Sequence, residues 1–193
     1  MLAQLSTVKT RCGITASTDD AVLTNFIELA TGVFNRHCNR TFARSATATD
    51  EFAADHCELN LSRPPLETVS TWELLTSQAD GWVTQTGVDY VPRTTPGGCI
   101  LSLAEPLGTY RQRVRVTYAG GYVLPGTSPT GSQVALPDEI EHACVEQVVC
   151  WYQNRTKLGL QSAGEAIVFA DNRQLALLPQ VRAALASHVR WNP

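Results

Sequence analysis

The stretch that decides the fold is Val116–Tyr122, VTYAGGY, in which an alternating apolar run ends in two glycines. A glycine pair in this position either cradles a phosphate or ends a strand. A phosphate loop needs a helix directly after the glycines, so that free backbone amides face the anion. After the glycines, no helical pattern begins until Pro137. We therefore interpret Gly120 and Gly121 as a strand end or bulge that needs positive φ or close backbone approach. Pro137 is interpreted as a structural turn residue at the first position of the next helix.

Helical periodicity lies on both sides of this strand. A first short helix is compatible with Ser6–Arg11. The segment Ser17–Cys38, STDDAVLTNFIELATGVFNRHC, opens with acidic residues and then keeps apolar positions at helical spacing, which predicts an amphipathic helix. The segment Leu136–Arg155, LPDEIEHACVEQVVCWYQNR, predicts a second long helix. A last helix is expected over Pro179–His188.

The middle of the chain has the shorter period of β-strands. Runs rich in β-branched and aromatic residues are separated by Gly and Pro, and they lie in Cys57–Leu75, Gly81–Val91, Cys99–Leu103 and Arg113–Tyr118. A linker rich in Pro, Gly and Ser follows over about 123–136 and is longer than a tight turn requires. A further short strand is expected at Ala166–Phe169, AIVF.

The order of these segments predicts an α+β fold. We expect mainly a helical bundle, made of the early helix, the long central helix and the C-terminal helix, packed with a small antiparallel β region. The length fits a single domain. The expected organisation is one α+β domain over residues 1–187, with the β region at about 52–122, and a C-terminal arm over 188–193.

Composition limits the classes of function. A formal net charge of -3 and the absence of a Lys/Arg cluster argue against a protein that grips nucleic acid through a basic face. No apolar run approaches the roughly 20 residues of a membrane span, and the start of the chain lacks the apolar core of a secretory signal. We therefore expect a soluble protein made in a cytoplasm. The six cysteines have no CxxC spacing, so no zinc ribbon is predicted.

Two adjacent His-Cys pairs, His37-Cys38 and His56-Cys57, are the most enzyme-like feature. A thiolate nucleophile needs a neighbouring base, and metal sites use the same residue types. Adjacent residues point in different directions, however, so neither pair forms a site by itself. No hydrolase, zincin, Walker or dinucleotide-binding motif is present. We expect no catalytic, metal-binding or cofactor-binding residues, and a small cysteine-dependent enzyme remains the rival hypothesis.

The order of segments resembles the head-to-tail connector (adaptor) proteins of tailed bacteriophages, of the type that docks under the portal ring. The residues that carry the resemblance begin with DDAVLTNFIELATGVFNRHCNRTF and LNLSRPPLETVSTWEL. They continue with VRVTYAGGY, LPDEIEHACVEQVVCWYQNR and LLPQVRAALASHVRW, so that the resemblance covers about Val22 to Trp191. One departure is the linker at 123–136, which looks long and could reach a neighbouring subunit or the next ring.

The resemblance implies a structural subunit without enzymatic activity. It implies a virion location at the head-to-tail interface and a ring of about a dozen copies that follows the portal's symmetry. The implied partners are the portal protein, neighbouring copies, a neck stopper or tail protein, and genomic double-stranded DNA that passes through the channel without specific binding. The end that inserts into the portal would be His188, Val189, Arg190, Trp191, Asn192 and Pro193. A stopper or tail-completion protein is a further alternative.

Overall fold

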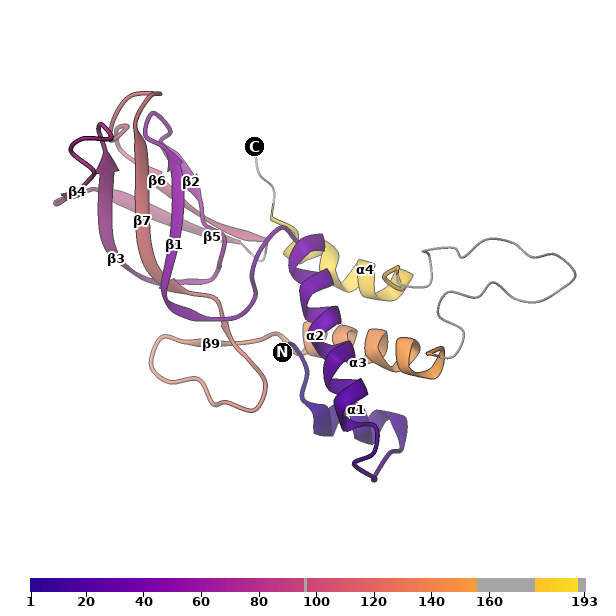
Figure 1. Cartoon of the computed structure of the whole chain (residues 1–193). Helices are drawn as coiled ribbons and strands as arrows, with labels where there is room; N and C mark the ends of the chain where they lie inside the picture. Colours follow the sequence, from indigo (N-terminus) through magenta and orange to yellow (C-terminus); the bar gives the residue numbers. More distant parts are fainter. Residues whose placement is uncertain (96, 156–175, 191–193) are drawn as a thin grey trace, which may run out of the picture. The chain divides into compact units, whose positions relative to one another are not determined.

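A computed structural model describes residues 1–95, 97–155 and 176–190 (Figure 1). The chain divides into two compact units. Met1–Phe34 and Leu136–Ala186 form the first, which we call the helical unit. Asn35–Ala135 and Ser187–Pro193 form the second, which we call the β unit.

The helical unit contains α1 (Leu5–Cys12), most of α2 (Asp20–His37), α3 (Asp138–Gln153) and α4 (Pro179–Leu185). The four helices predicted from periodicity are confirmed. The starts of α2 and α3 follow the chemistry of helix N-termini, because Asp20 lies in the first turn of α2 and three acidic residues lie in the first turn of α3. No helix among the described residues is both long and apolar enough to cross a membrane.

The core of the helical unit is built from one face of α2 and from more than half of the circumference of α3. In α2 the buried residues recur every three or four positions, at Leu23, Ile27, Ala30 and Phe34. In α3 they include Ile140, Cys144, Val148 and Trp151. The rings of Phe26 and Trp151 lie 6.3 Å apart. Two polar contacts also link the helices of this unit. Lys9 pairs with Asp20 at 2.6 Å, and the Tyr152 hydroxyl donates to Asp19.

The β unit holds two antiparallel sheets. The four-stranded sheet has the order β1-β7-β3-β4, and the three-stranded sheet has the order β2-β6-β5. The strands are β1 (Ser45–Ala53), β2 (Glu58–Asn60), β3 (Leu66–Leu75), β4 (Trp82–Gln85), β5 (Tyr90–Thr95), β6 (Gly98–Leu103) and β7 (Arg113–Gly120). Two short strands, β8 (Tyr122–Val123) and β9 (Val134–Ala135), pair in parallel.

The two sheets of the β unit share one apolar core. Alternate residues of β6, and of the first part of β7, are buried, as the period of two requires. The cluster contains Ala48, Ala54, Leu59, Leu61, Trp72, Leu74, Cys99, Leu101, Leu103, Val114, Val116 and Tyr118. Trp72 of one sheet contacts Tyr90 of the other, with ring centroids 5.5 Å apart.

The prediction of a mainly helical bundle is wrong, because the protein is mainly β. The described residues contain four short α-helices and nine strands. Strand β1 is hard to recognise in the sequence because it lies at the edge of its sheet and buries only Ala48. Its other residues are mostly polar or small, so the sequence SATATDEFA carries little hydrophobic alternation. It begins at Ser45, ahead of the start expected near 52.

The predicted helix Pro179–His188 is present as α4 followed by a 3-10 turn at Ala186–His188. The predicted strand Ala166–Phe169 lies outside the described residues. The expected linker at 123–136 is bounded by β8 and β9, with Tyr122 opposite Val134 and Val123 opposite Ala135. The chain between them is therefore a closed loop and does not simply bridge two elements.

A buried hydroxyl network ties the four-stranded sheet to the chain that follows β2. The Tyr118 hydroxyl donates to Asp50 at 2.7 Å, and the Ser62 hydroxyl donates to the other carboxylate oxygen at 2.7 Å. The amide of Arg63 donates to the Tyr118 oxygen at 3.1 Å. Burial, together with the Asp50 carboxylate, raises the pKa of Tyr118 above its ordinary value, so this phenol keeps its proton.

The glycine pair lies where three segments of the β unit meet. Gly120 ends β7, and a Cβ there would lie 2.6 Å from the Arg63 carbonyl oxygen. Gly121 has φ +95°, and a Cβ there would lie 2.7 Å from the Ala43 carbonyl oxygen. The Gly121 amide donates to the Pro65 carbonyl at 2.9 Å. No phosphate cradle forms, because β8 rather than a helix follows.

We predict that Tyr118→Phe lowers the free energy of unfolding by about 1–3 kcal/mol, because Asp50 and the Arg63 amide lose a buried partner. Tyr110→Phe is the matched control, since Tyr110 is 77% exposed and the same hydroxyl is lost. Its effect should stay within about 0.5 kcal/mol. Denaturant unfolding measures both, and equal effects would show that the network does not stabilise the β unit.

We predict that Gly121→Ala costs more than about 3 kcal/mol, because it combines an unfavourable φ with a backbone collision. Gly131→Ala isolates the first effect, since Gly131 has φ +60° and open space around the position of a Cβ. It should cost about 1–2 kcal/mol. Thermal and denaturant unfolding of the two variants give the comparison. A Gly121→Ala cost no larger than that of Gly131→Ala would contradict the close approach.

Candidate functional site

The C-terminal arm, expected to dock on a portal, begins on the β unit. Of its six expected residues the structure describes His188, Val189 and Arg190, whereas Trp191, Asn192 and Pro193 lie outside the described residues. His188 ends the 3-10 turn and is only 4% exposed. Its ring meets the Phe42 ring edge-on, with centroids 6.3 Å apart. The first residue of the arm is therefore part of the packed β unit.

Arg190 fixes the arm by three hydrogen bonds to carbonyl oxygens. Its amide donates to Cys38 at 2.8 Å, its Nε donates to Asn39 at 2.8 Å, and its Nη1 donates to Asn60 at 2.9 Å. The turn before β6 leaves room for the arm because Gly97 has no side chain. A Cβ there would lie 2.7 Å from the Val189 carbonyl oxygen. The arm is thus seated between the end of α2, β2 and the β5–β6 turn.

A buried guanidinium lies beneath the seat of the arm. Arg40 is 3% exposed, and its Cζ lies 4.8 Å from the centroid of Phe42 and 5.3 Å from that of Tyr122. It donates to the Pro64 carbonyl. Burial lowers the pKa of Arg40, yet two aromatic faces and a carbonyl compensate for much of the lost hydration. Nothing in the local sequence predicts this role for Arg40.

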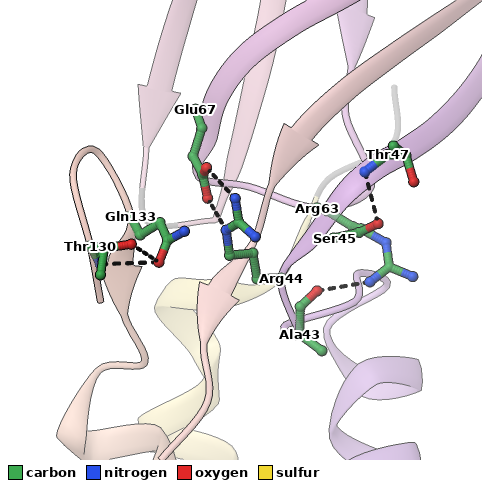
Figure 2. A network of polar contacts seen from close by, with 8 residues as sticks. All are labelled: Ala43, Arg44, Ser45, Thr47, Arg63, Glu67, Thr130 and Gln133. Atoms are coloured by element: carbon green, nitrogen blue, oxygen red, sulfur yellow. Dashed lines mark hydrogen bonds and ion pairs between the residues drawn. The ribbon is translucent and has the colours of Figure 1, made fainter. Parts of the chain in front are cut away.

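The closed loop Leu124–Gln133, which we call the β8–β9 loop, is the second exposed feature of the β unit (Figure 2). Gln133 Oε1 accepts from the Thr130 amide at 3.1 Å and holds the end of the loop. Beside it Arg44 pairs with Glu67 through two bonds of 2.6 and 2.8 Å, and the Arg44 amide donates to the Tyr122 carbonyl at 2.9 Å. The loop therefore stands on a rigid base.

Pro137 is the third structural turn residue predicted from the sequence. It is the N-cap residue of α3, with φ -57° and ψ 134°. Its conformation is extended, and its carbonyl accepts from the Ile140 amide at 3.0 Å. The residue therefore ends the segment that follows β9 and begins the first turn of the helix.

The structure places the two His-Cys pairs in different surroundings. Cys38 is buried, and burial raises its pKa to about 11, which opposes thiolate formation. The imidazole of His56 is largely exposed and lies 3.9 Å from Asp55. None of the six cysteines, all of which lie within the described ranges, forms a disulfide. The described residues contain no cluster of three His, Cys, Asp or Glu that could hold a metal ion.

Comparison with solved structures finds chains from the neck of a gene transfer agent particle. A chain from the neck of the empty particle, computed with C6 symmetry, has TM-score 0.61 and 12% identity over 100% of this chain and 91% of that chain. A chain from the virion of the native particle has TM-score 0.63 and 14% identity over the same shares. A chain from the native neck, computed with C12 symmetry, has TM-score 0.51 and 17% identity over 90% and 85%.

These likenesses define the fold as one that also occurs in chains of a particle neck and virion. The model of the head completion protein family matches residues 1–191, and the chain belongs to this family. No curated protein matches the sequence. Family membership confirms the predictions of a structural virion protein of the head-to-tail region and of a protein that is not an enzyme.

We predict that Cys38 reacts slowly with a disulfide reagent in the native protein. At pH 7.5 a thiol with a pKa near 11 carries about 300-fold less thiolate than an ordinary cysteine. The rate should rise with pH and should become ordinary after unfolding in guanidinium. A Cys38→Ser variant identifies the signal. Fast labelling of Cys38 near neutral pH in the folded chain would contradict the packed, unreactive thiol.

Proposed function

We propose that the chain is the subunit of a ring that docks beneath the phage portal, extends the DNA channel and joins the head to the next neck or tail component. The observation that carries the proposal is the family match over residues 1–191. The fold likeness to neck chains supports it, since those necks were computed with C6 and C12 symmetry. A ring of twelve copies around the portal axis would have both C12 and C6 symmetry.

The charge of the chain is consistent with DNA that slides through the ring. Tight DNA binding relies on clustered Lys and Arg that displace counterions from phosphates. This chain has 15 Lys and Arg against 18 Asp and Glu. Exposed arginines are also paired with carboxylates, as in Arg93–Glu58 and Arg11–Glu146. DNA that passes through such a ring would be repelled by the protein surface or would not bind to it.

The C-terminal arm is the proposed contact with the portal. His188 and Arg190 are held on the β unit, so the last three residues start from a defined position. Trp191 is the proposed anchor, because Trp and Arg are enriched among the residues that dominate protein interfaces. The other face of the ring would meet a stopper or tail protein. A stopper or tail-completion role for this chain itself is the alternative.

We predict that a chain truncated after Arg190 folds normally but binds portal rings at least tenfold more weakly, because it loses the proposed anchor. Truncation after Ser187 is a less suitable variant, because it also removes buried His188 and the three hydrogen bonds of Arg190. It should therefore lower the unfolding midpoint as well. Trp191→Ala should reproduce most of the loss, and Asn192→Ala should reproduce little of it. Cosedimentation with purified portal rings measures the affinities.

Unchanged portal binding by the chain that ends at Arg190 would show that the arm is not the docking element. A wild-type chain that does not bind the portal but binds a purified neck or tail component would support the stopper alternative instead.

A further inference from the structure

Helix α2 has more apolar surface than the helical unit buries. Successive residues of a helix are about 100° apart, so the buried residues Leu23, Ile27, Ala30 and Phe34 span only about 60° of its circumference. The apolar arc is wider, at about 160°, because it continues through half-buried Phe26 and Val33 to Val22 and Leu29. The last two are 38% and 41% exposed.

Val22 and Leu29 are two turns apart and lie on one line along the helix. We call them, with Phe26 and Val33 beside them, the α2 stripe. Val22 and Leu29 are two of the seven large hydrophobic residues that are exposed among the described residues. Single exposed apolar residues need no explanation, but an ordered row beside a core marks an interaction surface. Its occupant should bring no charge, because an unpaired charge against Leu29 would lose its hydration.

The β8–β9 loop has the required chemistry. No Asp, Glu, Lys, Arg or His occurs from Val116 to Pro137, although 17% of the whole chain is charged. Residues 127–132 are all exposed, and Val134 at the base of the loop is 44% exposed. Interface cores are depleted in charged residues in the same way. The paired ends of the loop limit the entropy that it loses when it binds.

We propose that the β8–β9 loop of one copy covers the α2 stripe of the next copy in the ring. A closed ring needs contacts between two different surfaces of each subunit. The loop and the part of α2 from Val22 to Leu29 offer two such surfaces, and the charge of Arg36 lies two turns beyond Leu29. Each copy offers its loop to one neighbour and its stripe to the other. The inference rests on the proposed ring function, and it specifies which surfaces form the contact.

The test places opposite charges on the two surfaces. Leu29→Glu puts a carboxylate into the stripe, and Ser128→Lys puts an ammonium onto the exposed loop. Each variant alone should form portal-bound rings at least tenfold less well than the wild type, because each buries an unpaired charge. Thr24→Glu is the matched control, since it adds the same charge about 140° away around α2. Circular dichroism confirms that the variants are folded.

A one-to-one mixture of the two variants is the decisive sample. In an alternating ring every stripe with the new carboxylate meets a loop with the new ammonium, and every other contact is wild type. The mixture should therefore recover ring formation to within about threefold of the wild type. A contact within one chain could not be rescued in this way.

Normal rings from Leu29→Glu, or failure of the mixture to recover, would overturn the inference while leaving the ring function in place. Rings of the Leu29→Glu variant that form normally but do not bind the next neck component would also overturn the inference. The stripe would then contact that component and not a neighbouring copy. A wild-type chain that forms no ring on the portal would contradict the proposed function together with the inference.

Discussion

The close approach of backbones at Gly121 is the constraint on which the β unit depends. At this point the chain leaves β7. It lies against the segment between α2 and β1 and against the connection between β2 and β3. The amides of Gly121 and Tyr122 donate to the Pro65 and Phe42 carbonyls at 2.9 and 2.7 Å. A side chain at position 121 would separate these segments. The seat of the arm, with Arg40 against Phe42 and Tyr122, is built directly on this crossing.

This arrangement explains why a structural virion protein still needs a specific structure. The crossing holds the start of β1 and β8 in place, and the arm and the β8–β9 loop both begin there. The two parts proposed to contact the portal and a neighbouring copy are therefore supported by one rigid region. Assembly proteins need such preorganised contact surfaces, because order that already exists in the monomer is not lost again on binding.

The sequence predicts the helices better than the fold class. Amphipathic periodicity over Asp20–His37 and Asp138–Gln153 is strong, and both helices are present. Six of the nine described strands have six residues or fewer, and β1 buries only one of its nine residues, so the helices dominate the expectation of a bundle. Strand pairing depends on contacts between distant residues, which periodicity does not report. Likewise, no local pattern reveals that Arg190 binds the carbonyls of Cys38, Asn39 and Asn60.

The central claim is that this head completion protein forms the ring beneath the portal. Electron cryomicroscopy of the virion neck, reconstructed with and without imposed symmetry, tests it most directly. We expect about a dozen copies in contact with the portal, with density for the chain end after Arg190 entering the portal and an open channel along the axis. Density for the chain at the far side of the neck, or in a position without portal contact, would contradict it.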